Sequence, residues 1–80
     1  LKNFMEKDIL KILNKISKRS KIKESTNIIK SKIFDSLDLI NLIFELEEFY
    51  NIKFNDKDLQ DKNFNKLNNI KNIIVKKIKK

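Results

Sequence analysis

Residues 35–54 read DSLDLINLIFELEEFYNIKF, a stretch in which apolar residues recur three and four positions apart. At about 100° per residue, this spacing predicts one helix that begins at Asp35 or Ser36 and ends near Tyr50 or Asn51. The broad apolar sector of the helix is the face that we expect to pack against the rest of the fold. That sector contains Leu39, Leu42, Ile43, Leu46, Phe49 and Tyr50.

The same helix carries a second apolar line on the roughly opposite side, formed by Leu37, Ile40 and Phe44. A helix that packs through one face needs no second apolar line, so this pattern indicates a docking surface for a basic partner. Four carboxylates flank or join the line: Asp38, Glu45, Glu47 and Glu48. The alternative is that the three apolar residues also belong to the core and are covered by a long loop.

Three further segments surround this helix. A first helix is expected from about Asn3 to Ser17, and one or two helical turns are expected within residues 55–62, with Asp56 as the N-cap. Residues 18–34 lack periodicity and predict a loop, pinned to the bundle by Ile22, Ile28, Ile29, Ile33 and Phe34. The last helix is predicted by an apolar stripe of Leu67, Ile70, Ile73, Ile74 and Ile78.

The 80-residue chain contains no glycine, proline, cysteine or histidine. Without glycine and proline, hairpins and tight turns lose their best local signals, which favours a chain made of helices. The expected fold is therefore all-α, a small four-helix bundle of three longer helices and one short helix. We expect it to form a single domain over residues 1–80.

The missing residue types also exclude several kinds of site. A chain without cysteine and histidine has no disulfide framework, no cysteine nucleophile and no His-based triad or metal site. A chain without glycine has no glycine-rich phosphate loop. We therefore expect no metal site, and no enzyme activity, because no tuned acid–base pair can be named. No apolar run approaches the ~20 residues of a membrane span and no signal peptide is evident, so the cytoplasm, or an organelle matrix, is the expected compartment.

The net charge of +8 is unevenly distributed along the sequence. Residues 35–61 hold eight acids and two bases, a net charge of −6, whereas the remainder holds seventeen bases and three acids, a net charge of +14. The basic flanks are interpreted mainly as the solvated surface of a protein rich in Lys, Asn and Ile. The alternative is a basic helical module that binds nucleic acid or an anionic membrane.

Ser36 directly follows Asp35 at the predicted start of the helix. Asp and Ser are common N-cap residues, so the simplest interpretation of the pair is a helix cap. A functional interpretation also has a physical basis, because a phosphate esterified at a helix N-terminus is favoured by the dipole and the unpaired N–H groups. Without a histidine to activate it, Ser36 would be a residue that another enzyme modifies rather than a catalytic nucleophile.

Residues 35–54 resemble the acyl carrier protein family around its Asp-Ser-Leu motif. Here Asp-Ser-Leu-Asp is followed by an apolar helix, then by Leu-Glu-Glu-Phe and an Ile-x-Phe stretch that leads to Asp56. The resemblance implies that a phosphopantetheinyl transferase attaches 4′-phosphopantetheine from coenzyme A to Ser36. It further implies that this arm holds an acyl or aminoacyl group as a thioester, for fatty acid or related biosynthesis.

The resemblance also implies which residues meet other proteins. Asp35 would help to position the metal ion that the transferase uses. The transferase, and the enzymes that load or transfer acyl or aminoacyl groups, would contact Asp35, Leu37, Asp38, Ile40, Phe44, Glu45, Glu47 and Glu48. We expect a monomer that binds no nucleic acid and does not insert stably into a membrane.

Some positions depart from the family pattern. Lys32 stands where many members have glycine, and Asn41 stands where many fatty-acid carriers have glutamate. Leu59, Phe64, Asn65 and the run of residues 68–70 look more like D-alanyl carriers and related stand-alone carriers. A carrier is therefore the leading hypothesis, with the cargo left open. The alternatives that remain are the basic helical module that binds nucleic acid or an anionic membrane, and a carrier-like structural subunit that lacks the arm.

Overall fold

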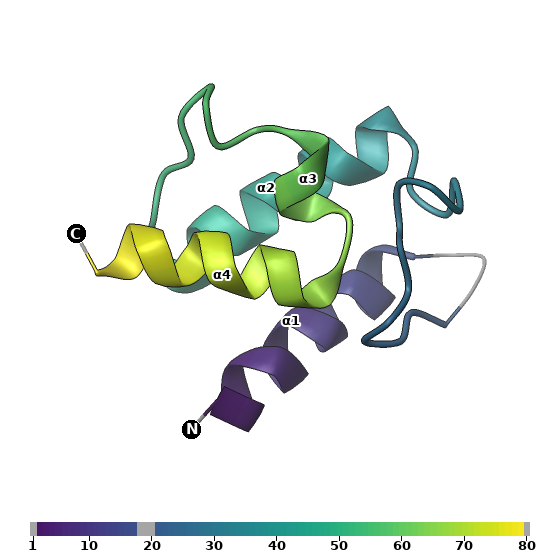
Figure 1. Cartoon of the computed structure of the whole chain (residues 1–80), viewed down its shortest axis with the longest axis horizontal. Coiled ribbons are helices and arrows are strands. Elements are labelled where there is room, and N and C mark those ends of the chain that lie inside the picture. Colours follow the sequence, from purple (N-terminus) through teal and green to yellow (C-terminus); the bar gives the residue numbers. More distant parts are fainter. Residues whose placement is uncertain (1, 18–20, 80) are drawn as a thin grey trace.

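The computed structural model describes residues 2–17 and 21–79, and within these residues the chain forms helices and no strand. The helices are α1 (Lys2–Ile16), α2 (Ser36–Tyr50), α3 (Asp61–Phe64) and α4 (Leu67–Ile78) (Figure 1). This confirms the predicted all-α bundle of three longer helices and one short helix. All four helices occur in the predicted order, although the short helix lies slightly later in the chain than expected.

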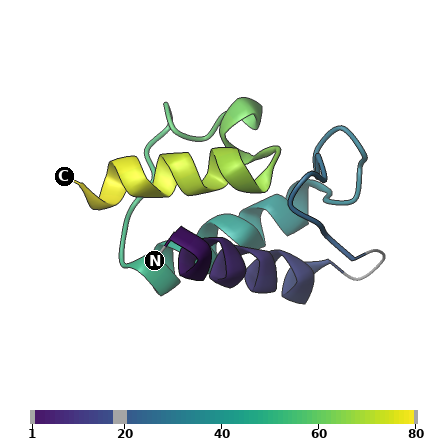
Figure 2. The same cartoon turned by 60° about the horizontal axis from the view of Figure 1, so that its bottom comes forward.

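Helix α1 packs against both α2 and α4, and α3 packs against α4. In Figure 2, α1 and α2 lie side by side and run in opposite directions, and α4 lies above both of them in that view. Burying a Leu or Ile side chain completely stabilises the fold by roughly 1.5–3 kcal/mol, so these contacts dominate its stability. The fully buried side chains of the three longer helices are Ile9, Leu13, Leu42, Leu46, Ile70 and Ile74.

The apolar stripe of α4 is buried as predicted at four of its five positions. The exception is Ile78, which is half exposed. It is the last residue of α4, where the helix ends and no later element covers it. The buried members are Leu67, Ile70, Ile73 and Ile74.

The predicted loop between α1 and α2 is pinned down by buried side chains. Ile22, Ile28 and Phe34 are buried in the core, and Ile29 and Ile33 pack against it. The predicted start of the loop at Lys18 lies outside the described residues. Pinning the loop places the residues just before α2 at a fixed end of the bundle.

Asn14 on α1 holds the first described part of this loop. Its Nδ2 donates hydrogen bonds to the carbonyl oxygens of Leu10, at 3.0 Å, and Ile22, at 3.2 Å. The backbone N–H of Ile22 donates in return to Asn14 Oδ1 at 2.7 Å. One side chain therefore fixes the loop against the helix.

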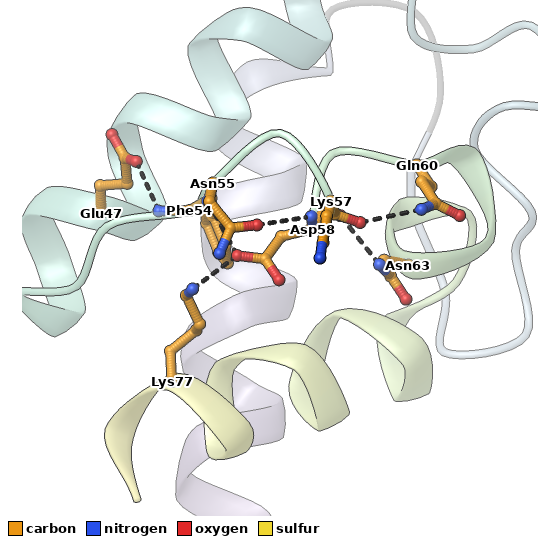
Figure 3. A network of polar contacts seen from close by, with 8 residues as sticks. All are labelled: Glu47, Phe54, Asn55, Lys57, Asp58, Gln60, Asn63 and Lys77. Atoms are coloured by element: carbon orange, nitrogen blue, oxygen red, sulfur yellow. Dashed lines mark hydrogen bonds and ion pairs between the residues drawn. The ribbon is translucent and has the colours of Figure 1, made fainter. Parts of the chain in front are cut away.

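The short helix was predicted within residues 55–62 with Asp56 as its N-cap, but it lies at Asp61–Phe64 and follows Gln60, so the predicted bounds and cap were wrong. Asn55 and Asp58 instead bind each other: the N–H of Asn55 donates to Asp58 Oδ2 at 2.8 Å, and the N–H of Asp58 donates to Asn55 Oδ1 at 3.1 Å (Figure 3). These reciprocal bonds close a turn, and the helix begins only at Asp61. The physical reason is burial, because Phe64 is buried at the end of α3 whereas Leu59 remains exposed.

Ion pairs connect this turn and α1 to the last helix. Lys77 Nζ lies 2.6 Å from Asp58 Oδ2, with both side chains largely shielded from solvent (Figure 3). Lys71 Nζ lies 3.0 Å from Glu6 Oε2.

Within the described residues, no helix combines the length and the apolar character that crossing a bilayer requires.

Candidate functional site

The N-terminus of α2 is defined by a reciprocal cap. Asp35 adopts an extended backbone conformation and accepts a 2.8 Å hydrogen bond on Oδ1 from the N–H of Asp38. The Asp38 carboxylate accepts in turn from the N–H of Asp35 at 3.2 Å. This capping box satisfies two backbone donors and fixes the first turn. It fixes the first helical residue as Ser36.

Ser36 is exposed to solvent at the point where α2 begins. Its side chain makes no hydrogen bond to any residue in ranges 2–17 and 21–79, since the cap is supplied by Asp35. The hydroxyl is therefore accessible to another macromolecule, and it stands at the positive end of a fifteen-residue helix. Asp35 alone supplies the helix cap, so the side chain of Ser36 is left without a structural role in it.

The chain reaches Ser36 through a bend that contains no glycine. Lys32 adopts a left-handed backbone conformation with φ of 61°, and its N–H donates to the carbonyl of Ile29 at 3.1 Å. Phe34 is buried, and its N–H donates to the carbonyl of Ile28 at 3.2 Å. The backbone conformation that glycine would adopt readily is thus reached by a lysine. The buried phenyl ring anchors the chain two residues before the serine.

The second apolar line of α2 is exposed along its length. Leu37 is 64% exposed, Ile40 47% and Phe44 63%, and these three residues are called the α2 stripe below. The alternative in which the long loop covers them is therefore wrong. The stripe begins at the residue next to Ser36 and extends along the outer face of the helix. An exposed apolar surface of this kind is typical of a site that meets another molecule.

The carboxylates around the α2 stripe differ in what they contact. Asp35 and Asp38 bind each other's backbone in the cap. Glu45 lies 3.5 Å from Lys15 on α1. Glu47 accepts a 2.9 Å hydrogen bond from the N–H of Phe54, a residue beyond the end of the helix (Figure 3).

Sequence reasoning missed these internal roles of the acids. The Lys15–Glu45 pair joins two helices, so no local spacing signals it. The sequence indicates the hydrogen bond from the N–H of Phe54 to Glu47 only weakly, through the position of Glu47 just before the chain turns back at the end of the helix. Glu48 is exposed and has no ion pair or hydrogen bond within the described residues. It is the member of the predicted row whose carboxylate is most available to a partner.

The C-terminal end of α2 forms a groove that continues the α2 stripe. The helix ends at Asn51, which has a left-handed backbone conformation with φ of 54°, and the N–H of Ile52 donates to the carbonyl of Glu47 at 3.1 Å. The groove has a volume of about 540 Å³. Its lining includes Phe44, Glu45, Glu47, Glu48 and Ile52. The lining also contains one base, Lys53, so three glutamates against one lysine, together with the negative end of the helix, favour a cationic partner here.

Phe49 departs from its predicted place in the core-facing sector of α2. Its side chain is 57% exposed, and its ring packs edge-on against Tyr50 with centroids 4.9 Å apart. Phe49 lies at the edge of the predicted sector, near the last turn, where the neighbouring helix no longer covers it. The remaining members of the sector are buried or pack against the core: Leu39, Leu42, Ile43, Leu46 and Tyr50.

A small apolar cavity of about 70 Å³ lies between the loop, α2 and α3. Its walls include Ile29 from the loop, Leu39 and Ile43 from α2, and Phe64 from α3. A dry cavity of about 150 Å³ is large enough to hold benzene, so this one has room for only a few carbon atoms. Leu39 lies one turn after Ser36, which places the cavity near the exposed hydroxyl.

Tyr50 is the only tyrosine of the chain and has a shifted titration. Its hydroxyl oxygen is buried, and it has no hydrogen-bond partner among the described residues. Burial, and to a smaller extent the nearby charge of Asp8, raise the pKa of this phenol from 10 to about 12. The described residues contain no group of three or more Asp or Glu side chains arranged to hold a metal ion.

Comparison with known proteins finds relatives of one kind. The chain is 40% identical over 52 residues to the acyl carrier protein of Brachyspira hyodysenteriae strain ATCC 49526 / WA1. The match spans 65% of this chain and 67% of the relative. The acyl carrier protein of Brachyspira hyodysenteriae without a specified strain matches with the same identity and coverage. No model of a known protein family matches the chain, and no solved structure matches it.

Proposed function

Because this chain belongs to the acyl carrier protein family, whose members are carriers without catalytic activity of their own, we propose that Ser36 bears a 4′-phosphopantetheine arm. The observation that carries the proposal is the position of the hydroxyl. Ser36 is exposed at the first position of a capped helix, and the exposed α2 stripe starts at the next residue. A modifying enzyme therefore finds an accessible hydroxyl beside an apolar docking surface.

The residues around Ser36 fit the chemistry of the arm. The arm's phosphodiester is an anion, and an anion at a helix N-terminus is stabilised by about 0.3–1 kcal/mol. When bound, the arm supplies the thiol that this cysteine-free chain lacks, and that thiol holds an acyl or aminoacyl group as a thioester. The chain offers no histidine for this step, and Asp35 is engaged in the helix cap, so we assign the base that removes the Ser36 proton to the transferase.

The α2 stripe supports docking of a transferase and of the enzymes that load or consume the acyl group. Apolar residues provide the contact area, and exposed carboxylates, Glu48 above all, attract basic side chains on the partner. Each exposed ion pair contributes only about 0.2–1 kcal/mol, which allows the protein to leave one enzyme for the next. We place this exchange in the cytoplasm, with the protein acting as a monomer in fatty acid or related biosynthesis.

The cavity beside Leu39 bears on the cargo. Its volume of about 70 Å³ admits a short acyl group of a few carbons. A longer chain must either enlarge the space between the loop, α2 and α3 or remain outside the fold. This favours short acyl or aminoacyl cargo in the conformation described here.

Intact-mass measurement after incubation with coenzyme A and a broad-specificity phosphopantetheinyl transferase tests the proposal. We expect the wild-type chain to gain one arm and the Ser36→Ala variant to gain none. Ser31→Ala is the matched control, because Ser31 is also exposed and lies in the loop just before α2. This variant should be modified like the wild type.

An unmodified wild-type chain, or arm attachment that persists in Ser36→Ala, would contradict the proposal. A chain that stays unmodified in its native cell while co-purifying with one constant partner would instead identify a carrier-like structural subunit.

A further inference from the structure

The solvent-facing side of α1 is basic. Lys7, Lys11 and Lys15 lie on successive turns of this helix and are exposed. Phe4 shares their face, since it precedes Lys7 by three positions, and its side chain is 68% exposed. Figure 2 shows that α1 lies along one side of the molecule, and the lysine face borders α2 at Lys15, which pairs with Glu45. The row spans about 12 Å from Lys7 to Lys15 at 1.5 Å per residue.

A groove of about 630 Å³ runs along this face. Its lining surface is mostly apolar, because the Leu10 side chain and the stems of the lysines form it while the ammonium groups reach solvent. The groove is held in shape by Asn14, whose hydrogen bonds fix the backbone of Ile22 beside the helix. It is called the α1 groove below and is lined by Lys7, Leu10, Lys11, Asn14, Lys15 and Lys21.

The described residues place no carboxylate in the lining of the α1 groove. Of the nearby acids, Glu6 pairs with Lys71 at 3.0 Å and Glu45 with Lys15 at 3.5 Å, whereas Asp8 on α1 has no ion-pair partner among the described residues and borders this face. Glu24 is exposed and lines an adjoining hollow together with Lys7. The groove therefore keeps a net positive potential, which the proposed arm and the α2 stripe do not use.

We propose that the α1 groove docks the protein on an anionic phospholipid surface. The ammonium groups would meet lipid phosphates, while Leu10, Phe4 and the lysine stems contact the apolar boundary below the headgroups. Lysines are flexible point charges without the planar fork that binds one anion in a fixed geometry, so a row of them suits a surface of many mobile anions. The apolar lining favours such an amphiphilic surface over the purely polar backbone of a nucleic acid.

Binding to vesicles tests this proposal with the full 80-residue chain. Vesicles of mixed phosphatidylcholine and phosphatidylglycerol are compared with vesicles of phosphatidylcholine alone in a flotation assay. We expect binding only to the mixed vesicles, decreasing as salt is added. The double variant Lys7→Glu/Lys11→Glu should bind at least about tenfold more weakly, because each basic residue near an anionic membrane contributes to its affinity.

The matched control is Lys57→Glu/Lys62→Glu, which changes the net charge equally at two exposed lysines. Lys62 lies in α3, which is on the other side of α4 from α1 in both views, and Lys57 lies in the segment that leads to α3 (Figures 1 and 2). We expect the control to retain at least about a third of the wild-type affinity. Circular dichroism checks that both variants keep the helical fold.

A fluorescent reporter localises the contact. The chain contains no tryptophan, so Phe4→Trp and Phe49→Trp each introduce a single reporter, on α1 and α2 respectively. Mixed vesicles should shift the emission of the Trp at position 4 to the blue and leave that at position 49 unchanged. Vesicle binding should also be the same in Ser36→Ala, so it succeeds or fails independently of the proposed carrier function.

Three outcomes would overturn the membrane proposal. The first is equal binding to neutral and anionic vesicles. The second is an equal loss of binding in the two double variants, which would mean that overall charge alone acts. The third is binding to double-stranded DNA or polyglutamate without binding to vesicles, which would assign the α1 groove to a different macromolecule.

Discussion

Helices α1 and α2 have the same length and share one core, yet they present opposite surfaces to solvent. Each has fifteen residues, and each buries an apolar side against the other. The outer face of α1 carries a row of lysines, whereas the outer face of α2 carries exposed apolar residues flanked by carboxylates. The inner faces are both apolar because each must pack into the core. The outer faces do not pack, so their side chains are free to differ and to be selected by what each face binds.

If the outer face of α2 serves binding rather than packing, it should contribute much less to stability than the inner face. Leu46 is fully buried, so Leu46→Ala should lower the free energy of unfolding by about 2–5 kcal/mol. Phe44 belongs to the exposed α2 stripe, and Phe44→Ala should change that free energy by less than about 1 kcal/mol. Urea denaturation followed by circular dichroism measures both. Equal losses would show that the stripe is part of the core.

The contact between the two helices can be followed through Tyr50. Its phenol should titrate near pH 12 rather than near pH 10, because burial, and to a smaller extent Asp8 on α1, disfavour the phenolate. The folded-state pKa lies above the unfolded value, so the neutral phenol's stabilisation is complete below pH 10. It is lost as the pH rises from 10 towards 12.

Ultraviolet absorbance of the phenolate measures this titration without interference, because the chain has one tyrosine and no tryptophan. In Asp8→Asn the midpoint should fall but stay above the ordinary value, since burial is the larger cause. A wild-type midpoint at pH 10 in the folded protein would show that α1 does not shield the hydroxyl.

The smallest effect is expected at the ion pair between Lys15 and Glu45, where the outer faces of α1 and α2 meet. Lys15→Ala removes the 3.5 Å ion pair with Glu45 and should change the free energy of unfolding by only about 0.2–1 kcal/mol, since both side chains are well exposed. Lys11→Ala is the control, one turn earlier on the same face and without an ion pair in the described part of the chain. A difference between the two variants well above 1 kcal/mol would mean that this pair holds the helices together.

Sequence alone predicted α2 closely because its signals are local. Asp35 and Asp38 have the spacing of a reciprocal cap, and the apolar residues that follow repeat with the helical period. The exposure of Leu37 and Phe44 was also predictable, since one helix cannot bury two opposite faces in a bundle of this size. The conformation of these residues is determined by neighbours only a few positions away in the sequence. The attachment of an arm to Ser36 remains a prediction.

Other features depend on contacts between distant residues and escaped prediction. The short helix begins at Asp61 because burial of Phe64 and the turn between Asn55 and Asp58 determine its place, whereas Asp56 looked equally suitable as a cap. The engagement of Glu45 depends on Lys15, thirty residues earlier in the sequence. The groove on α1 depends on a loop whose first part is fixed by hydrogen bonds to Asn14, eight residues before Ile22.

The left-handed lysine before Ser36 has a consequence for the evolution and engineering of this chain. An L-residue other than glycine in that conformation costs roughly 1–2 kcal/mol, whereas glycine adopts it freely at the expense of about 0.5–1 kcal/mol of additional chain entropy. Lys32 therefore retains a modest energetic penalty that a single codon change to glycine would relieve. The bend itself is preserved by the anchoring of Phe34, so a lineage can gain or lose glycine at this position while leaving the serine where it stands.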